Sequence, residues 1–64
     1  MRLKELKSGF AIIEYNAYHK YFQNTFVFRL LNDLDEAKYN ADSLYRCDHV
    51  NYAVYDCKNK KLIY

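Results

Sequence analysis

The clearest pattern of apolar and polar positions lies in residues 31–46, LNDLDEAKYNADSLYR. Its apolar positions recur at the three- and four-residue spacing of one helix face, with a lysine that contributes only its aliphatic stem. These positions are Leu34, Ala37, Lys38, Ala41, Leu44 and Tyr45. Asp33 and Glu36 have the spacing of a capping box. The pattern therefore predicts an amphipathic helix that begins after Asp33.

Two strand-like runs precede this helix. GFAIIEY (residues 9–15) is short, apolar and rich in β-branched side chains, and TFVFRLL (residues 25–31) alternates. Alternation in the second run gives one face with Phe26, Phe28 and Leu30 and the other with Val27, Arg29 and Leu31. Before both runs, Leu3 and Leu6 allow a single helical turn that ends at Ser8-Gly9.

A hairpin is expected after the helix. NYAVYDC (residues 51–57) alternates and places Cys57 on a face that we expect to turn toward the helix. The run CKNKK then forms a tight turn, in which Asn59 is the residue best suited to a left-handed conformation. LIY (residues 62–64) closes the hairpin.

The aromatic stretch YNAYHKYF (residues 15–22) fits two structures. Helical spacing groups Tyr15, Tyr18, His19 and Phe22, whereas strand spacing groups Tyr15, Ala17, His19 and Tyr21. Periodicity does not decide between them. Because the stretch lies between two strand-like runs, we expect it at the turning end of the first hairpin, with both strands extending into it.

These elements predict an α+β fold: a small antiparallel sheet in β-β-α-β-β order, with one helix packed on one face. A single helix covers only one side of such a sheet, yet the strands carry large apolar side chains on both sides. A bare apolar face would exceed what monomers normally tolerate. We therefore expect a second copy of the chain, as a homodimer, or a protein partner to cover it.

The length of 64 residues predicts a single domain over residues 1–64, with a small core. There is no Pro and only one Gly, which indicates order almost from end to end. Eight Tyr and four Phe supply a large buried area for so short a chain. Neither a membrane helix nor the apolar core of a secretory signal is present in the sequence, so we expect a cytoplasmic protein without membrane contact.

The residues that carry chemistry argue against catalysis and metal binding. Cys47, His49 and Cys57 do not have the spacing of a zinc site, and in a reducing compartment both thiols are expected to be free. Cys47, Asp48 and His49 are too close in sequence to converge as a nucleophile, an acid and a base. We expect neither a cofactor nor a metal, and no enzymatic activity.

Two binding functions remain. The leading hypothesis is protein binding, and the alternative is single-stranded nucleic-acid binding by the same aromatic sheet face. The candidate contact residues are Tyr15, Tyr18, His19, Lys20, Tyr21, Phe22 and Arg29. The net charge of +2 is too small to indicate nucleic acid by itself, but both ends of the chain are basic and the middle is acidic. The basic ends carry Arg2, Lys4 and Lys7, then Lys58, Lys60 and Lys61.

The second half of the chain resembles small accessory proteins encoded by bacteriophages and other mobile elements. The residues that carry this resemblance are Leu34, Glu36, Ala37, Ala41, Ser43 and Leu44, followed by YAVYDCKNKKLIY from Tyr52 to Tyr64. It covers roughly residues 30–64. The resemblance implies a compact, non-enzymatic protein that inhibits or redirects a host protein, including components of host defence, in the host cytoplasm. It implies no particular functional residue.

Overall fold

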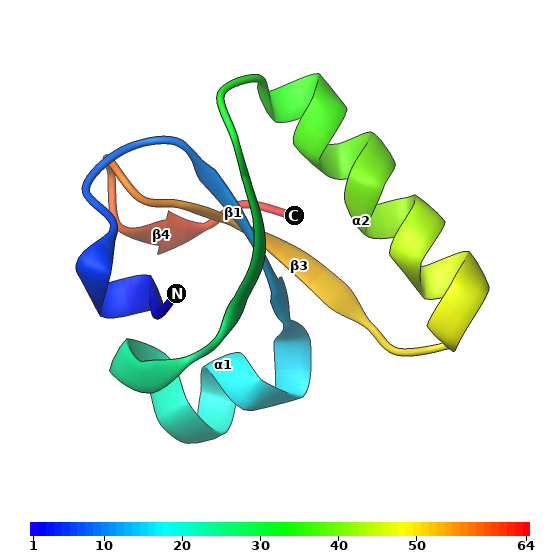
Figure 1. Ribbon diagram of the computed structural model, residues 1–64, viewed down its shortest axis with the longest axis horizontal. Coiled ribbons are helices and arrows are strands. Elements are labelled where there is room, and N and C mark those ends of the chain that lie inside the picture. Colours follow the sequence, from blue (N-terminus) through cyan, green and yellow to red (C-terminus); the bar gives the residue numbers. More distant parts are fainter.

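The computed structural model describes residues 1–64, except for the side chains of Tyr21 and Gln23. Four antiparallel strands form one sheet in the order β2-β1-β3-β4 (Figure 1). The strands are β1 (Phe10–Glu14), β2 (Val27–Leu31), β3 (Tyr52–Asp56) and β4 (Lys61–Leu62). This confirms the predicted α+β fold and the predicted order of the main elements.

The helix α2 (Leu34–Asp48) begins and ends with residues suited to its caps. The Asp33 carboxylate accepts a hydrogen bond from the Asp35 N–H at 3.1 Å, which stabilises the first turn. At the other end, His49 adopts the left-handed conformation with φ 58° and donates its N–H to the Tyr45 carbonyl at 2.7 Å. Asp33 caps the helix as predicted, but through the Asp35 N–H and not through the Glu36 position of the predicted capping box.

One face of the sheet packs against α2 (Figure 1). The central positions of the predicted apolar stripe, Ala37 and Ala41, are buried against Ile12 of β1 and Val54 of β3. Because alanine is small, the helix axis can lie close to the strands, and larger side chains seal the margins of this contact.

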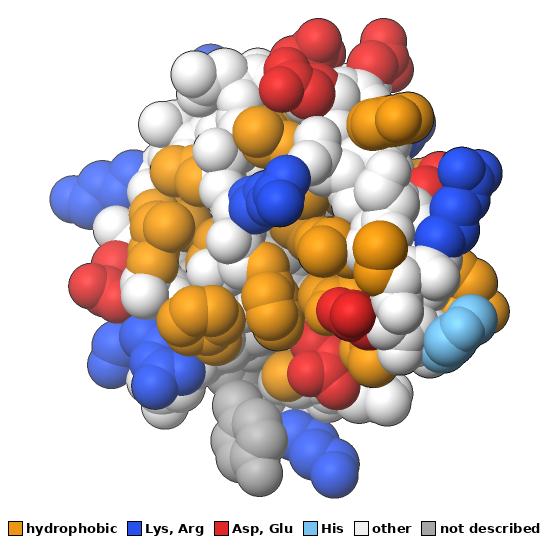
Figure 2. All heavy atoms as spheres, turned by 45° about the vertical axis from the view of Figure 1, so that its right-hand side comes forward, with side chains coloured by type: hydrophobic (Ala, Val, Ile, Leu, Met, Phe, Trp, Pro, Cys, Tyr) orange, Lys and Arg blue, Asp and Glu red, His pale blue; other side chains and the backbone are white. Residues whose placement is uncertain are grey.

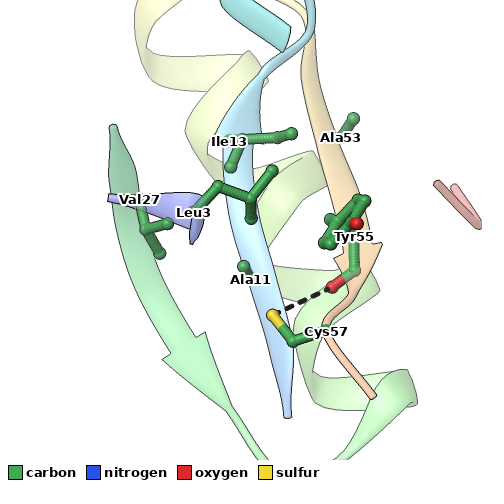
Figure 3. Close-up of a cluster of buried hydrophobic side chains, with 7 residues drawn as sticks. All are labelled: Leu3, Ala11, Ile13, Val27, Ala53, Tyr55 and Cys57. Atoms are coloured by element: carbon green, nitrogen blue, oxygen red, sulfur yellow. Dashed lines mark hydrogen bonds between the residues drawn. The ribbon is translucent and has the colours of Figure 1, made fainter. Parts of the chain in front are cut away.

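The other face of the sheet is covered by the chain itself. The short 3-10 helix η1 (Leu3–Glu5) places the Leu3 side chain among those of β1, β2 and β3 (Figure 3). The backbone ties this segment to β2, since the Leu3 N–H donates to the Thr25 carbonyl at 2.9 Å and the Val27 N–H donates to the Met1 carbonyl at 3.0 Å. The buried cluster on this side consists of Leu3, Ala11, Ile13, Val27, Ala53, Tyr55 and Cys57.

Because η1 covers this side of the sheet, the prediction of a bare second sheet face is wrong. Leu6 and Tyr18 pack against the same cluster from outside the sheet. The molecule therefore has helical segments on both sides of its strands (Figure 1). The apolar face from which we inferred a covering second copy is already buried in one chain.

The aromatic stretch is a helix, and the prediction of two strands extending into it is wrong. The helix α1 (Tyr15–Tyr21) follows β1 directly, and the 3-10 helix η2 (Phe22–Asn24) follows α1. The Thr25 hydroxyl donates to the Ala17 carbonyl at 3.2 Å near the start of β2. In the helix, the Tyr18 ring packs against Tyr55 of the sheet. Periodicity within the stretch cannot reveal this long-range contact.

A bulge in β2 breaks the predicted alternation. Ile12 pairs with Arg29 while Ile13 pairs with Val27, so Phe28 is the extra residue. Val27 consequently lies in the cluster opposite α2, whereas Arg29 contacts α2. The prediction that these two residues share a face is wrong, because one inserted residue reverses the faces of a strand.

The turn between β3 and β4 also differs from expectation. Lys60, not Asn59, has the left-handed conformation, with φ 57°. The Asn59 amide nitrogen instead donates to the Asp56 carboxylate at 2.7 Å, and the N–H groups of Lys58 and Asn59 donate to the same carboxylate at 3.1 Å. The aspartate organises the turn, which leaves the positive φ to the residue that closes it.

Both cysteines are free, and they lie on opposite sides of the sheet. Cys57 is buried in the cluster opposite α2, so the prediction that it faces the helix is wrong. Cys47 is exposed on α2. In the described part of the chain, no helix is both long and apolar enough to cross a membrane.

Candidate binding surface

The predicted contact residues fall into two separate places: most lie on α1 or at the start of η2, whereas Arg29 lies on β2. Tyr15, Tyr18, His19 and Lys20 lie on α1, and Phe22 begins η2. The Tyr21 side chain lies outside the described residues.

The rings of α1 form a chain of edge-to-face contacts that leads into the core. The centroids of Tyr15 and His19 are 4.4 Å apart, those of Tyr18 and His19 are 5.7 Å apart, and those of Tyr18 and Phe22 are 5.0 Å apart. Tyr18 also lies 5.8 Å from Tyr55 of β3 and is half-buried. Such contacts stabilise aromatic pairs beyond the area that they bury.

These rings divide into core and surface. Tyr18 anchors α1 to the buried cluster, so it serves mainly the fold. Tyr15 and Phe22 remain 39% and 38% exposed. The candidates for direct contact with a partner are therefore Tyr15 and Phe22, with the exposed His19 and Lys20 beside them.

Arg29 does not belong to this surface. Its guanidinium donates to the Asn40 side-chain oxygen on α2 at 2.6 Å, on the opposite side of the sheet from α1. Lys20, Arg29 and the α1 rings consequently do not share one face. The particular basic and aromatic surface predicted for nucleic acid is not assembled.

A groove of about 620 Å³ lies next to Phe22, on the face opposite α2. Its floor is apolar and consists of Leu3, Leu6, Phe22, Tyr55 and Cys57. Since Leu3, Tyr55 and Cys57 belong to the buried cluster, the floor is the outer surface of the core itself. Phe22 links this groove to the exposed rings of α1.

Three lysines line the groove, and none of them is among the predicted contact residues. Lys4 and Lys7 come from the N-terminal segment, and Lys60 comes from the turn between β3 and β4. The N-terminal segment lies beside β4 in the fold (Figure 1). The signal was the basic character of both ends of the chain, but only folding brings those ends together.

The groove floor is electrically neutral at ordinary pH. Burial raises the pKa of the Cys57 thiol and also that of the Tyr55 hydroxyl. A protonated, buried thiol is a poor nucleophile, which suits packing better than catalysis. The charge of the groove therefore resides in its lysines.

A second group of exposed rings lies at the start of β2, where Phe26 directly precedes the strand and Phe28 is its bulged residue. Phe26 and Phe28 are 47% and 43% exposed, with ring centroids 5.4 Å apart. Phe28 also meets Tyr52 edge to face at 5.1 Å, and the Arg2 guanidinium lies 5.9 Å from the Phe26 ring centroid. In a view that turns the α2 side of the molecule forward, hydrophobic side chains form a band across the surface (Figure 2).

The possible metal ligands do not converge. Cys47 and His49 lie at the end of α2, while Cys57 is buried across the sheet. Among the side chains that the structure describes, no group of three or more His, Cys, Asp or Glu residues could hold a metal ion.

Comparison with protein-family models, with curated proteins and with solved structures finds no significant match. The resemblance to phage accessory proteins therefore rests only on the residues of α2 and the C-terminal hairpin that carry it.

Proposed function

We propose that this chain is a non-enzymatic protein that acts by binding another protein, through α1 and the groove beside it. The observation that supports this most is the exposure of Phe22, which lines the groove, although the chain has already covered both faces of its sheet. Tyr15 is exposed on the adjoining helix α1. Isolated exposed rings are common, but rings beside a concave apolar surface are typical of a contact site. Aromatic side chains bury much area and lose little rotamer freedom on binding.

The resemblance to phage-encoded accessory proteins extends this proposal to a role. Binding would inhibit or redirect a host protein, such as a component of host defence, in the host cytoplasm. A compact chain with a small apolar groove suits such a role, because it acts by occupying a surface of its target.

Capture from a nuclease-treated bacterial lysate tests the proposal. The tagged wild-type chain is expected to retain a stoichiometric protein band. Tyr15→Ser combined with Phe22→Ser should lose this band, because both exposed rings are removed. Tyr39→Ser is the matched control, since Tyr39 is 70% exposed on α2, away from the groove.

A third variant, Phe26→Ser with Phe28→Ser, separates the two groups of exposed rings. It should retain the captured band. Loss of the band only in this variant would move the contact surface to β2. The absence of any nuclease-resistant band with the wild-type chain would contradict protein binding itself.

Single-stranded nucleic acid is the alternative ligand, and the same capture experiment distinguishes it from a protein. Tyr55 is only 5% exposed, so it offers no free face for base stacking, and Arg29 lies across the sheet. If material is captured without nuclease and lost after nuclease treatment, the ligand is nucleic acid and not protein.

A further inference from the structure

On the basis of the protein-binding proposal, we infer that the groove receives an acidic segment of the partner, with a leucine- or phenylalanine-type side chain seated on the groove floor. Three features of the groove support this inference. They are its apolar floor, its lysines, and the hydrogen bonds that the nearest carboxylates already accept within local turns.

The floor fits an apolar anchor. It is formed by aliphatic and aromatic side chains and a protonated thiol, and it offers about 620 Å³. A volume of this size accommodates a few side chains, not a whole helix or domain. Tyr55 and Cys57 are only 5% and 1% exposed, so an inserted side chain would contact mainly Leu6 and Phe22, which lie over the packed core.

The lysines supply charge complementarity to an acidic sequence. Lys4, Lys7 and Lys60 are all exposed and come from two distant parts of the chain. Ammonium groups at separate points of a rim match carboxylates spaced along a peptide segment. The described residues that line the groove include no Asp or Glu.

The carboxylates closest to these lysines in sequence have other partners. Glu5 accepts a hydrogen bond from the Arg2 backbone N–H at 2.7 Å, within the turn of η1. Asp56 accepts a hydrogen bond from the Asn59 side chain at 2.7 Å within the β3–β4 turn. These bonds hold the two carboxylates in local turns, which favours pairing of the lysines with an incoming ligand.

A peptide fits this arrangement better than a nucleic acid does. Sequence-tolerant binding of single strands needs several free ring faces along a basic track. In the groove, Phe22 is half-exposed and Tyr55 is buried. One accessible ring with three lysines instead matches one apolar anchor between acidic residues.

Selection from a displayed library of random twelve-residue peptides tests the inference even before the partner is identified. Selection is made on the wild-type chain, with counter-selection on Lys4→Glu combined with Lys7→Glu. The enriched peptides should carry Asp or Glu around a Leu, Ile, Met or Phe. A synthetic copy should bind the double variant about tenfold more weakly, because two attractions become repulsions.

The matched control is Arg29→Glu combined with Arg46→Glu, which changes the net charge equally at exposed positions that do not line the groove. This control should bind the peptide within about twofold of wild type. Circular dichroism establishes that both double variants are folded. Enrichment of non-acidic peptides, no enrichment at all, or equal weakening by both variants would overturn the inference.

The two proposals fail in different ways. If lysate capture is lost in the Tyr15 and Phe22 variant but kept in the Lys4 and Lys7 variant, protein binding stands and the acidic segment is wrong. If the wild-type chain captures no nuclease-resistant protein, the protein-binding proposal fails.

Discussion

Cys47 and Cys57 lie in two very different environments. Cys47 is exposed on α2, whereas Cys57 is 1% exposed and forms part of the groove floor. Burial also raises the pKa of the Cys57 thiol, so little of it is ionised at neutral pH.

We predict that a thiol-specific reagent reacts rapidly with one cysteine per folded molecule. Cys47→Ser should abolish the rapid phase, and full reaction of Cys57 should require denaturant, because the buried thiol becomes accessible only on opening. Absorbance of the released chromophore measures both phases. Rapid labelling of the Cys47→Ser chain would contradict the burial of Cys57 in the cluster opposite α2.

Asp56 makes the β3–β4 turn sensitive to acid. Hydrogen bonds from the Asn59 side chain and backbone hold its pKa below the ordinary value of 3.8. Because the pKa is lower in the folded than in the unfolded chain, the ionised carboxylate stabilises the fold at higher pH. This stabilisation is lost as the pH falls below about 4 and through the folded pKa.

Asp56→Asn should therefore lower the urea midpoint at neutral pH, and the difference from wild type should shrink at about pH 2–3. Protonation makes the wild-type side chain neutral like that of the variant. Urea titrations of both chains at the two pH values measure this effect. A difference that is independent of pH would show that the charge of Asp56 does not stabilise the turn.

Tyr18 is the ring of α1 that packs against the buried cluster on the sheet. We predict that Tyr18→Ala lowers the free energy of unfolding by about 2 kcal/mol, because Tyr18 is half-buried against Tyr55. Tyr15→Ala is the control and should change it by less than about 0.5 kcal/mol, because Tyr15 is more exposed. Chemical denaturation measures both, and equal effects would argue against this division into core and surface.

The contrast between α2 and α1 shows what local pattern can predict. In α2 the apolar stripe and the Asp33 cap agree, so the helix follows from the sequence alone. In α1 the rings fit either a helix or a strand, and the contact of Tyr18 with Tyr55 favours the helix. The β2 bulge at Phe28 has no local signal of this kind, which is why the alternation gave the wrong faces.

The candidate site was predictable only in part. Tyr15 and Phe22 could be identified because the cluster of rings is evident in the sequence. Lys4 and Lys60 could not be placed together, since the arrangement of the N-terminal segment beside the β3–β4 turn is a property of the whole fold. Arg29 was assigned to the wrong face by the undetected bulge.

As a whole, the molecule uses its short N-terminal segment and α1 to complete the core. A 64-residue chain buries only about 60% of the surface that it exposes when unfolded. Covering both sheet faces therefore takes nearly every element, and the apolar surface that remains lies in the groove and on a few exposed rings. Exposed rings also lie on α2 and near the start of β2, so the concave groove with its lysines, not the number of exposed rings, is the physical basis for placing the binding surface opposite α2.

The most direct test of this account is an NMR titration of the isotope-labelled chain with the purified protein that it captures from lysate. We predict that the largest amide shifts fall on residues 3–7, on residues 15–22 and near Lys60, while the exposed face of α2 changes little. Shifts confined to α2 or to the Phe26 and Phe28 edge of β2 would contradict the central claim that this chain binds its partner through the lysine-lined groove and α1.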